Sequence, residues 1–357
     1  MAKTSTPHHK KPAGKGSRKD PLSKGRITSF AVVAVLAFVL PVLLGGALYV
    51  SGWITADQET SGNPAVSGPP LPPALQQACE EEKAVYDAAM QEAALEAAAE
   101  ESASGADPCQ EVLENLPAAA DGALYVGGYT PSDAVKEAVD ACIARTAQQG
   151  RAAGFVMLDL KTGKGVIYNT SQELYGASSI KIHRILAIAE AHPELMKNSK
   201  WAVRDVLVES DNDSYEWMYE TYGNSVLDKY VSDARASIRY SSGKQYAYYD
   251  TASFARMWKH AYDLMLSVPD CDAVGVLAEN PYYSSIHRLL GRSYTTRSKA
   301  GWIYEGGVRA AADGGIVYDK ESPYLLVIMS DYASDLTMLD SYVQALEQAH
   351  QEIRKQK

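Results

Sequence analysis

A long stretch without a charged side chain, from Ile27 to Ala56, constrains the fold of this sequence more than any other feature. Its centre reads FAVVAVLAFVLPVLLGGALYV, and about 20 consecutive apolar residues suffice for a helix to cross a bilayer. The stretch is longer than the apolar core of a signal peptide, and no small-x-small cleavage site closes it. The sequence therefore predicts an uncleaved transmembrane helix over residues 27–54, with a soluble secreted form as the alternative.

The residues before this stretch are strongly basic. Residues 1–26 hold eight lysines and arginines against the single acid Asp20. Basic flanks stay on the cytoplasmic side of a membrane, so we expect 1–26 to be a cytoplasmic tail. The predicted protein is a single-pass protein of the cell membrane. It contacts the lipid bilayer through 27–54, and everything after residue 57 lies outside the cytoplasm.

The rest of the chain is acidic, because the whole sequence has a formal net charge of −10 despite this basic tail. An acidic body argues against nucleic acid as a partner. The four cysteines of an exported chain suit two disulfides, for which three pairings exist. Proximity in the sequence weakly favours Cys79–Cys109 and Cys142–Cys271. None of the cysteines has a histidine at metal-ligand spacing, so the sequence indicates no metal site.

Residues 57–125 have the composition of a spacer. A Pro/Gly/Ser-rich linker, DQETSGNPAVSGPPLPP, comes first, and an Ala/Glu-rich stretch typical of a long helix follows it. The heptads of this stretch are poor, so a coiled-coil dimer is unconvincing and the oligomeric state stays open. We interpret 57–125 as a linker and helical stalk.

The pattern changes to that of a folded domain over residues 130–356. A capped amphipathic helix ending at Gly150 precedes two strands, AGFVMLDL and KGVIYN. A helix then starts at Ser178, and a mostly helical segment runs to about residue 290. Three more strands (TTRSKAGW, GGIVYD, YLLVIMSD) and a closing helix complete the chain. This order predicts an α+β fold: an antiparallel sheet flanked by helices, with an inserted helical subdomain.

The predicted helix at YGASSIKIHRIL begins with an unusual pair of side chains. Lys181 lies one turn after Ser178 on the same face, close enough to take the serine's proton. A serine hydroxyl is a weak nucleophile that needs such a base. Ser241 and Lys244 repeat the Ser-x-x-Lys spacing, but Gly243 lies between them and no apolar helix follows, so we set this copy aside.

Two further motifs follow in the chain: Ser210-Asp211-Asn212, and Lys299-Ala300-Gly301 on a predicted strand. In this order the three motifs resemble the signature of class A β-lactamases and penicillin-binding proteins. The resemblance covers about residues 130–356 and departs from the family at Ala300, where threonine or serine is usual. A literal Lys-Thr-Gly at 161–163 precedes the serine and is predicted to be a hairpin turn.

The resemblance implies the β-lactamase/transpeptidase-like fold and a serine hydrolase that forms an acyl-enzyme without a cofactor. Ser178 would be the nucleophile and Lys181 its base once neutral. Ser210 would relay the proton, and the cation of Lys299 would lower the pKa of Lys181. The implied substrates are β-lactams or the D-Ala-D-Ala-type stem peptides of peptidoglycan.

The resemblance also implies the residues that bind the substrate. Asn212 would hold a substrate amide, and the strand residues Ala300, Gly301 and Trp302 would line the site. The backbone N–H groups of Ser178 and Trp302 would form the oxyanion hole.

Each of these residues also has a purely structural interpretation. Ser178 would cap a helix, 210–212 would be a capping loop, and Lys299 would be a solvated lysine. His183 is expected to be a packed or surface histidine, and Arg309 to form a structural ion pair rather than to meet a substrate carboxylate.

Two features weaken the match. No glutamate occurs from Thr221 to Ala278, where the class A enzymes carry the residue that activates the deacylating water, and Asp233 and Asp250 are the acids of the loop segment. Ala300 lacks a hydroxyl for a substrate carboxylate. We therefore expect acylation without efficient deacylation. The alternative is a catalytically impaired, penicillin-binding-like scaffold or binding module of the cell envelope. The sequence does not choose between the two substrates.

Overall fold

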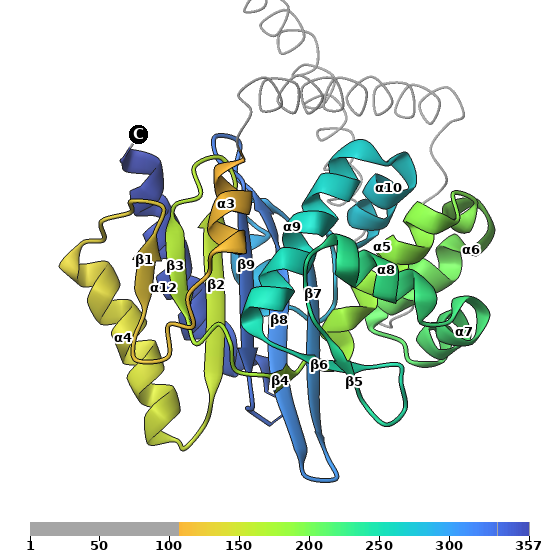
Figure 1. The fold of residues 1–357 in the computed structure, drawn as a ribbon, viewed down its shortest axis with the longest axis horizontal. Helices are drawn as coiled ribbons and strands as arrows, with labels where there is room; N and C mark the ends of the chain where they lie inside the picture. The colour runs from red at the N-terminus through yellow and green to blue at the C-terminus, as the bar shows by residue number, and fades with distance from the viewer. Residues whose placement is uncertain (1–106, 334, 357) are drawn as a thin grey trace, which may run out of the picture. The chain divides into compact units, whose positions relative to one another are not determined.

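The structure, a computed structural model, describes residues 107–333 and 335–356 (Figure 1). By its internal contacts the chain separates into Met1–Gln77 and Ala78–Lys357, and all described residues belong to the second unit. The predicted tail 1–26, the transmembrane helix 27–54 and most of the stalk lie outside the described residues. None of the helices described is both long enough and apolar enough to span a membrane.

One antiparallel sheet of six strands organises this unit, in the order β1-β3-β2-β9-β8-β7 (Figure 1). The strands are β1 Leu124–Val126, β2 Ala153–Asp159, β3 Gly165–Tyr168, β7 Thr295–Glu305, β8 Val308–Tyr318 and β9 Tyr324–Ser330. A small second sheet joins β4 Leu174–Tyr175, β6 Ala247–Tyr249 and β5 Arg239–Tyr240. The strands predicted from the sequence are all present, and β7 forms one edge of the large sheet.

Both faces of the sheet are buried. Val156 and Leu158 of β2 belong to one apolar core, whereas Phe155 and Met157 belong to the other. Alternate side chains of a strand point to opposite faces, so each face needs its own cover of helices. α4 Asp133–Gln148 and α12 Asp340–Lys355 contribute to the second core. The first contains residues of α5 Lys181–Ala191, α6 Leu195–Arg204, α7 Asp213–Tyr222, α8 Ser225–Asp233, α9 Thr251–Ser267 and α10 Pro269–Leu277.

The helical segment predicted between the strands is therefore present. α5 to α10 (Figure 1) and the short α11 Ser285–Leu290 all lie in the chain between β4 and β7. The Lys-Thr-Gly at 161–163 forms the turn between β2 and β3, as predicted. Asp159 closes this turn by accepting from the backbone N–H groups of Lys161 at 3.1 Å and Thr162 at 2.9 Å.

The folded domain begins earlier in the chain than the sequence indicated. α3 Pro108–Glu114 lies within the 57–125 range that we interpreted as a stalk, and β1 begins within it, yet β1 pairs with β3. Cys109 and Leu113 of α3 are fully buried. Asp107 caps α3 and forms an ion pair with the buried Lys259 of α9 at 2.7 Å. A strand of three residues is too short to show alternation, which is why the sequence pattern missed this end of the domain.

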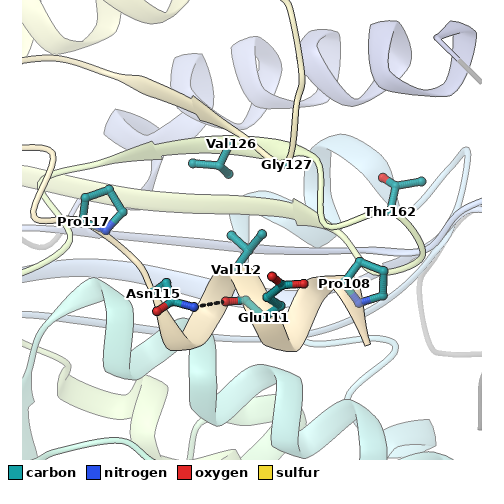
Figure 2. Close-up of a pocket in the computed structure, with 8 residues that line it drawn as sticks. All are labelled: Pro108, Glu111, Val112, Asn115, Pro117, Val126, Gly127 and Thr162. Carbon is teal, nitrogen blue, oxygen red and sulfur yellow. Dashed lines mark hydrogen bonds between the residues drawn. The ribbon is translucent and has the colours of Figure 1, made fainter. Parts of the chain in front are cut away.

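A hollow of about 380 Å³ lies between α3, β1 and the turn at Thr162 (Figure 2). Both polar and apolar residues line it, and Figure 2 shows Asn115 donating a hydrogen bond to the backbone carbonyl of Glu111. The lining residues are Pro108, Glu111, Val112, Asn115, Pro117, Val126, Gly127 and Thr162. None of the residues predicted to carry chemistry is among them, so we place the candidate site elsewhere.

The predicted Cys142–Cys271 disulfide is wrong. Both thiols are free, and they belong to the separate cores on opposite faces of the sheet. Burial raises the pKa of Cys271 to about 12 and also raises that of Cys109, and buried thiols of this kind are inert. Cys79, the partner predicted for Cys109, lies outside the described residues.

Candidate active site

The segment that carries Ser178 is a tight turn between β4 and α5. Residues Ala177–Ile180 form a 3-10 turn that opens with Ala177 at a positive φ of 46°. The Ser179 hydroxyl is buried against the carbonyl of Gly176 at 2.7 Å and the hydroxyl of Tyr249 at 2.6 Å. Of the two adjacent serines, Ser179 is therefore the one with a structural role. Ser178 is only half-buried, and its side chain caps neither the turn nor α5.

Lys181 is fully buried at the start of α5 and joins this turn to the second motif. Its Nζ donates to the carbonyls of Ser210 at 2.8 Å and Asp211 at 3.0 Å, and to Oδ1 of Asn212 at 2.7 Å. These three acceptors match the three N–H donors of a lysine ammonium. The ammonium also faces the ring of Tyr215, whose centroid lies 5.1 Å from Nζ.

Lys299 joins the third motif to the second. Its Nζ donates to the hydroxyl of Ser210 and to the carbonyl of Ala300, both at 2.9 Å, and the side chain is 1% exposed. Ser210 thus accepts from both lysines, through its carbonyl from Lys181 and through its hydroxyl from Lys299. Its backbone is left-handed, with a φ of 61°, and strained positions of this kind cluster at functional sites.

Gly301 brings the edge strand β7 against the turn that carries Ser178. A Cβ at position 301 would lie 2.6 Å from the backbone N of Ser178 and 2.3 Å from the carbonyl of Gly176. Only glycine allows this approach. The next residue, Trp302, is half-buried, and its ring centroid lies 4.8 Å from that of Tyr283. The three motifs, far apart in the sequence, therefore meet at one place.

Both lysines have a lowered pKa, and burial is the main cause for each. Burial, and after it the charge of Lys299, lowers the pKa of Lys181 to about 7, while Asp211 acts in the opposite direction. Burial lowers the pKa of Lys299 to about 7 as well, opposed by Asp313. Because the charge of Lys299 disfavours a second charge on Lys181, near neutral pH the pair can hold one proton instead of two.

Asn212 and Tyr246 complete the group around Lys181. Asn212 is exposed, and its Oδ1 accepts from Lys181 and, at 3.0 Å, from the hydroxyl of Tyr246. Sequence reasoning missed Tyr246, which lies in the loop before β6. No short motif marks a tyrosine in such a loop.

Asp313 is a second residue that sequence reasoning missed. It lies opposite Ala300 in the register of β7 and β8, and it is fully buried. Its Oδ2 accepts from the hydroxyl of Ser284 at 2.8 Å and from the backbone N–H of Ile286 at 3.0 Å. Burial raises its pKa to about 6. An aspartate inside the apolar strand AAADGGIVY was the signal that would have identified it.

Several structural interpretations are now resolved. Lys299 is buried and not solvated, whereas His183 is a packed histidine, fully buried, with its Nδ1 3.1 Å from the hydroxyl of Tyr230. Asp211 does have a capping role, since its Oδ1 accepts from the backbone N–H of Ser214 at 2.7 Å. Arg309, for which an ion pair was expected, lies over the ring of Tyr304.

The acids and the second Ser-x-x-Lys copy in the loop have other roles. Asp233 pairs with Lys229 on α8, and Asp250 caps α9 by accepting from the backbone N–H of Ser253 at 2.7 Å. Ser241 and Lys244 form a turn, in which the N–H of Lys244 donates to the carbonyl of Ser241. Neither aspartate forms a hydrogen bond or an ion pair with a residue of the three motifs.

The pair of lysines leads to a pH prediction. For the acylation of Ser178 that the family resemblance implies, we expect a rate constant with a bell-shaped pH profile centred near pH 7. At lower pH both lysines are protonated and no base remains, and at higher pH neither holds a proton to give to the leaving group. Acylation rates measured from about pH 5 to about pH 9 test this. A rate constant that is flat across this range would contradict it.

The sequence matches no protein-family model and no curated protein. Solved structures do match. A β-lactamase from Streptosporangium roseum is 16% identical, with a TM-score of 0.51, over 60% of this chain and 98% of its own. A representative of class A β-lactamase from Bacteroides cellulosilyticus is 14% identical, with a TM-score of 0.51, over 63% of this chain and 100% of its own.

A mutant of PBP-A, solved as an acyl-enzyme complex with penicillin G, is 15% identical, with a TM-score of 0.50, over 61% of this chain and 97% of its own. Likeness at such low identity establishes a fold and not an activity. The described part of this chain has the α+β fold of class A β-lactamases and of PBP-A.

Proposed function

We propose that this protein is a serine hydrolase that forms an acyl-enzyme on Ser178. The observation that carries the proposal is the convergence of the motifs. Two buried lysines from different elements bind the same residue, Ser210, and Gly301 packs against the backbone N of Ser178. A pair of buried amines with lowered pKa values is costly to maintain in a core, and such pairs are concentrated at catalytic sites.

The chemistry begins with neutral Lys181 and protonated Lys299. The Ser178 Oγ forms a bond to the substrate carbonyl carbon and gives its proton to Lys181. The backbone N–H groups of Ser178 and Trp302 would hold the oxyanion. The carbon–nitrogen bond then breaks as Ser210 gives its proton to the leaving nitrogen and takes one from Lys299, 2.9 Å away. The two lysines again share one proton, and the acyl group remains on Ser178.

The substrate class follows from this chemistry. An amide carbon with a nitrogen leaving group occurs in a β-lactam and in a D-Ala-D-Ala-type stem peptide, and the acyl-enzyme of PBP-A with penicillin G supports the first as a probe. Asn212, Ala300, Gly301 and Trp302 would bind the substrate. Ala300 offers no hydroxyl to a substrate carboxylate, and the loss of one such charge-assisted hydrogen bond costs about 1.5–3 kcal/mol.

Labelling with a fluorescent penicillin tests the proposal. We expect the purified protein to acquire one label, and we expect release to take minutes or longer. Asp233 and Asp250 are both engaged elsewhere, so the loop supplies no carboxylate to activate water. Rapid hydrolysis would contradict the slow release, and it would direct attention to Glu216, one helical turn after Asn212.

The alternative function is a penicillin-binding-like module of the cell envelope that has lost turnover. Ala300 and the engaged loop acids favour it. The same labelling experiment separates the two, because a scaffold would take up no label while its domain stayed folded.

We further propose that residues 27–54 anchor this domain to the cell membrane, with residues 1–26 in the cytoplasm. The basic tail and the uncharged stretch after it support this topology. A protease added to spheroplasts should remove the domain of residues 130–356 and leave a short N-terminal fragment in the membrane. Full protection of the domain would overturn the proposal.

A further inference from the structure

We propose that Tyr246 is a positioning residue that sets the substrate preference of this site. In this role it fixes the Asn212 side chain so that its NH₂ group is presented to an acyl donor with an amide next to the reacting carbonyl. The inference rests on the proposed function. Tyr246 lies in the loop before β6 and belongs to none of the three motifs.

The hydrogen bonds of Asn212 assign its orientation. A carbonyl oxygen has two lone pairs, and Oδ1 uses both, one for Lys181 at 2.7 Å and one for Tyr246 at 3.0 Å. The NH₂ group must then point away from both residues. Because Asn212 is exposed, this group remains available to an acceptor from outside, and the carbonyl oxygen of a substrate amide is such an acceptor.

Lys181 alone would not keep this orientation during the reaction. In its neutral form, which the chemistry requires, Lys181 has a lone pair that could accept from a flipped Asn212. Burial raises the pKa of Tyr246, so its hydroxyl stays protonated and keeps donating. Among the described residues, this hydroxyl donates to Oδ1 of Asn212, and a flipped amide would leave the hydroxyl proton of Tyr246 without an acceptor.

The backbone around Tyr246 is tied directly to the segment that carries Ser178. Tyr246 immediately precedes β6, which pairs with β4, and the carbonyl of Ala247 accepts from the N–H of Gly176 at 3.1 Å. The Tyr246 ring also packs against that of the buried Tyr215, with centroids 5.4 Å apart. Tyr246 is therefore held in a fixed relation to the proposed nucleophile.

Tyr246→Phe is the test, because it removes the hydroxyl and keeps the ring. The probes are a penicillin with an acylamino side chain and 6-aminopenicillanic acid, which has the same ring system but lacks that amide. A neutral hydrogen bond is worth enough to change a rate by about 2–10-fold. We expect Tyr246→Phe to slow acylation by the first probe more than acylation by the second, so that the ratio of the two rates falls by about that factor.

Two matched variants complete the design. Tyr248→Phe changes the next tyrosine along the chain, whose ring centroid lies 4.8 Å from that of Tyr175, and it should leave both rates and their ratio unchanged. Asn212→Ala should lose the preference for the penicillin with the acylamino side chain. Tyr246→Phe combined with Asn212→Ala should change the ratio of the two rates no further.

The outcomes separate this inference from the proposed function. If the unmodified protein is not acylated by either probe, the proposed function fails. If it is acylated, and Tyr246→Phe leaves both rates unchanged or slows both equally, Tyr246 has no role or only a structural role, and the inference is overturned.

Discussion

Ser178→Ala should abolish covalent labelling by a β-lactam. The unmodified protein should gain the mass of one penicillin on the peptide that contains Ser178, and the variant should gain none. The hydroxyl forms the bond to the acyl group, so its loss leaves no atom to carry the adduct. We expect the variant to stay folded, because the side chain is half-buried and caps neither the 3-10 turn nor α5.

Ser179→Ala is a poor control, because the Ser179 hydroxyl is buried and bonded to Tyr249. Removing its hydroxyl would disturb the turn itself. Ser241→Ala is the better control, since Ser241 starts the other Ser-x-x-Lys copy and lies in a turn. It should label as the unmodified protein does. An adduct that persisted in Ser178→Ala, or mapped to another serine, would remove the basis of the proposed mechanism.

The sequence predicted the large sheet well because its central strands are long and apolar. β2 and β9 are buried along their whole length, and runs of this kind bounded by turn residues are recognisable without a structure. The order of strands and helices followed from the same pattern. The short elements did not, because α3 and β1 owe their place to pairing with β3 and to the ion pair between Asp107 and Lys259.

The site was predictable to the extent that its residues form linear motifs. Lys181, Ser210, Asn212 and Lys299 occur in three recognisable strings, and the structure brings these strings together. Tyr246 and Asp313 belong to none of them. Tyr246 bonds to Asn212, and the charge of Asp313 raises the pKa of Lys299 against the effect of burial. Both effects depend on proximity in space, and no spacing in the chain indicates them.

The cysteine prediction failed for a related reason. Proximity in the sequence suggested a Cys142–Cys271 pair, but α4 and α10 pack on opposite faces of the sheet. A disulfide needs Cα atoms within about 7 Å of each other, and a sheet between two helices keeps them further apart than that. Sequence distance says nothing about which face of a sheet a helix covers.

Lys181→Ala should slow acylation by about 10²–10⁴, the range for the loss of a positioned base. Two effects contribute. The base is removed, and the carbonyls of Ser210 and Asp211 lose the donor that holds the second motif in place. The pH profile separates them: loss of the base removes the limb that rises toward pH 7, whereas a displaced motif would lower the rate and keep the limb.

Lys161→Ala provides the matched control for this variant. Lys161 belongs to the Lys-Thr-Gly of the β2–β3 turn, which copies a motif of the family but lies in another part of the sheet. We expect its loss to leave acylation unchanged.

Restored acylation of Lys181→Ala on addition of a small primary amine would strengthen the assignment, because an external base would then replace the missing one. If Lys181→Ala were acylated at the normal rate, Lys299 would be the only amine bonded to Ser210 among the described residues. The base would then have to be Lys299, and the role proposed for Lys181 would be wrong.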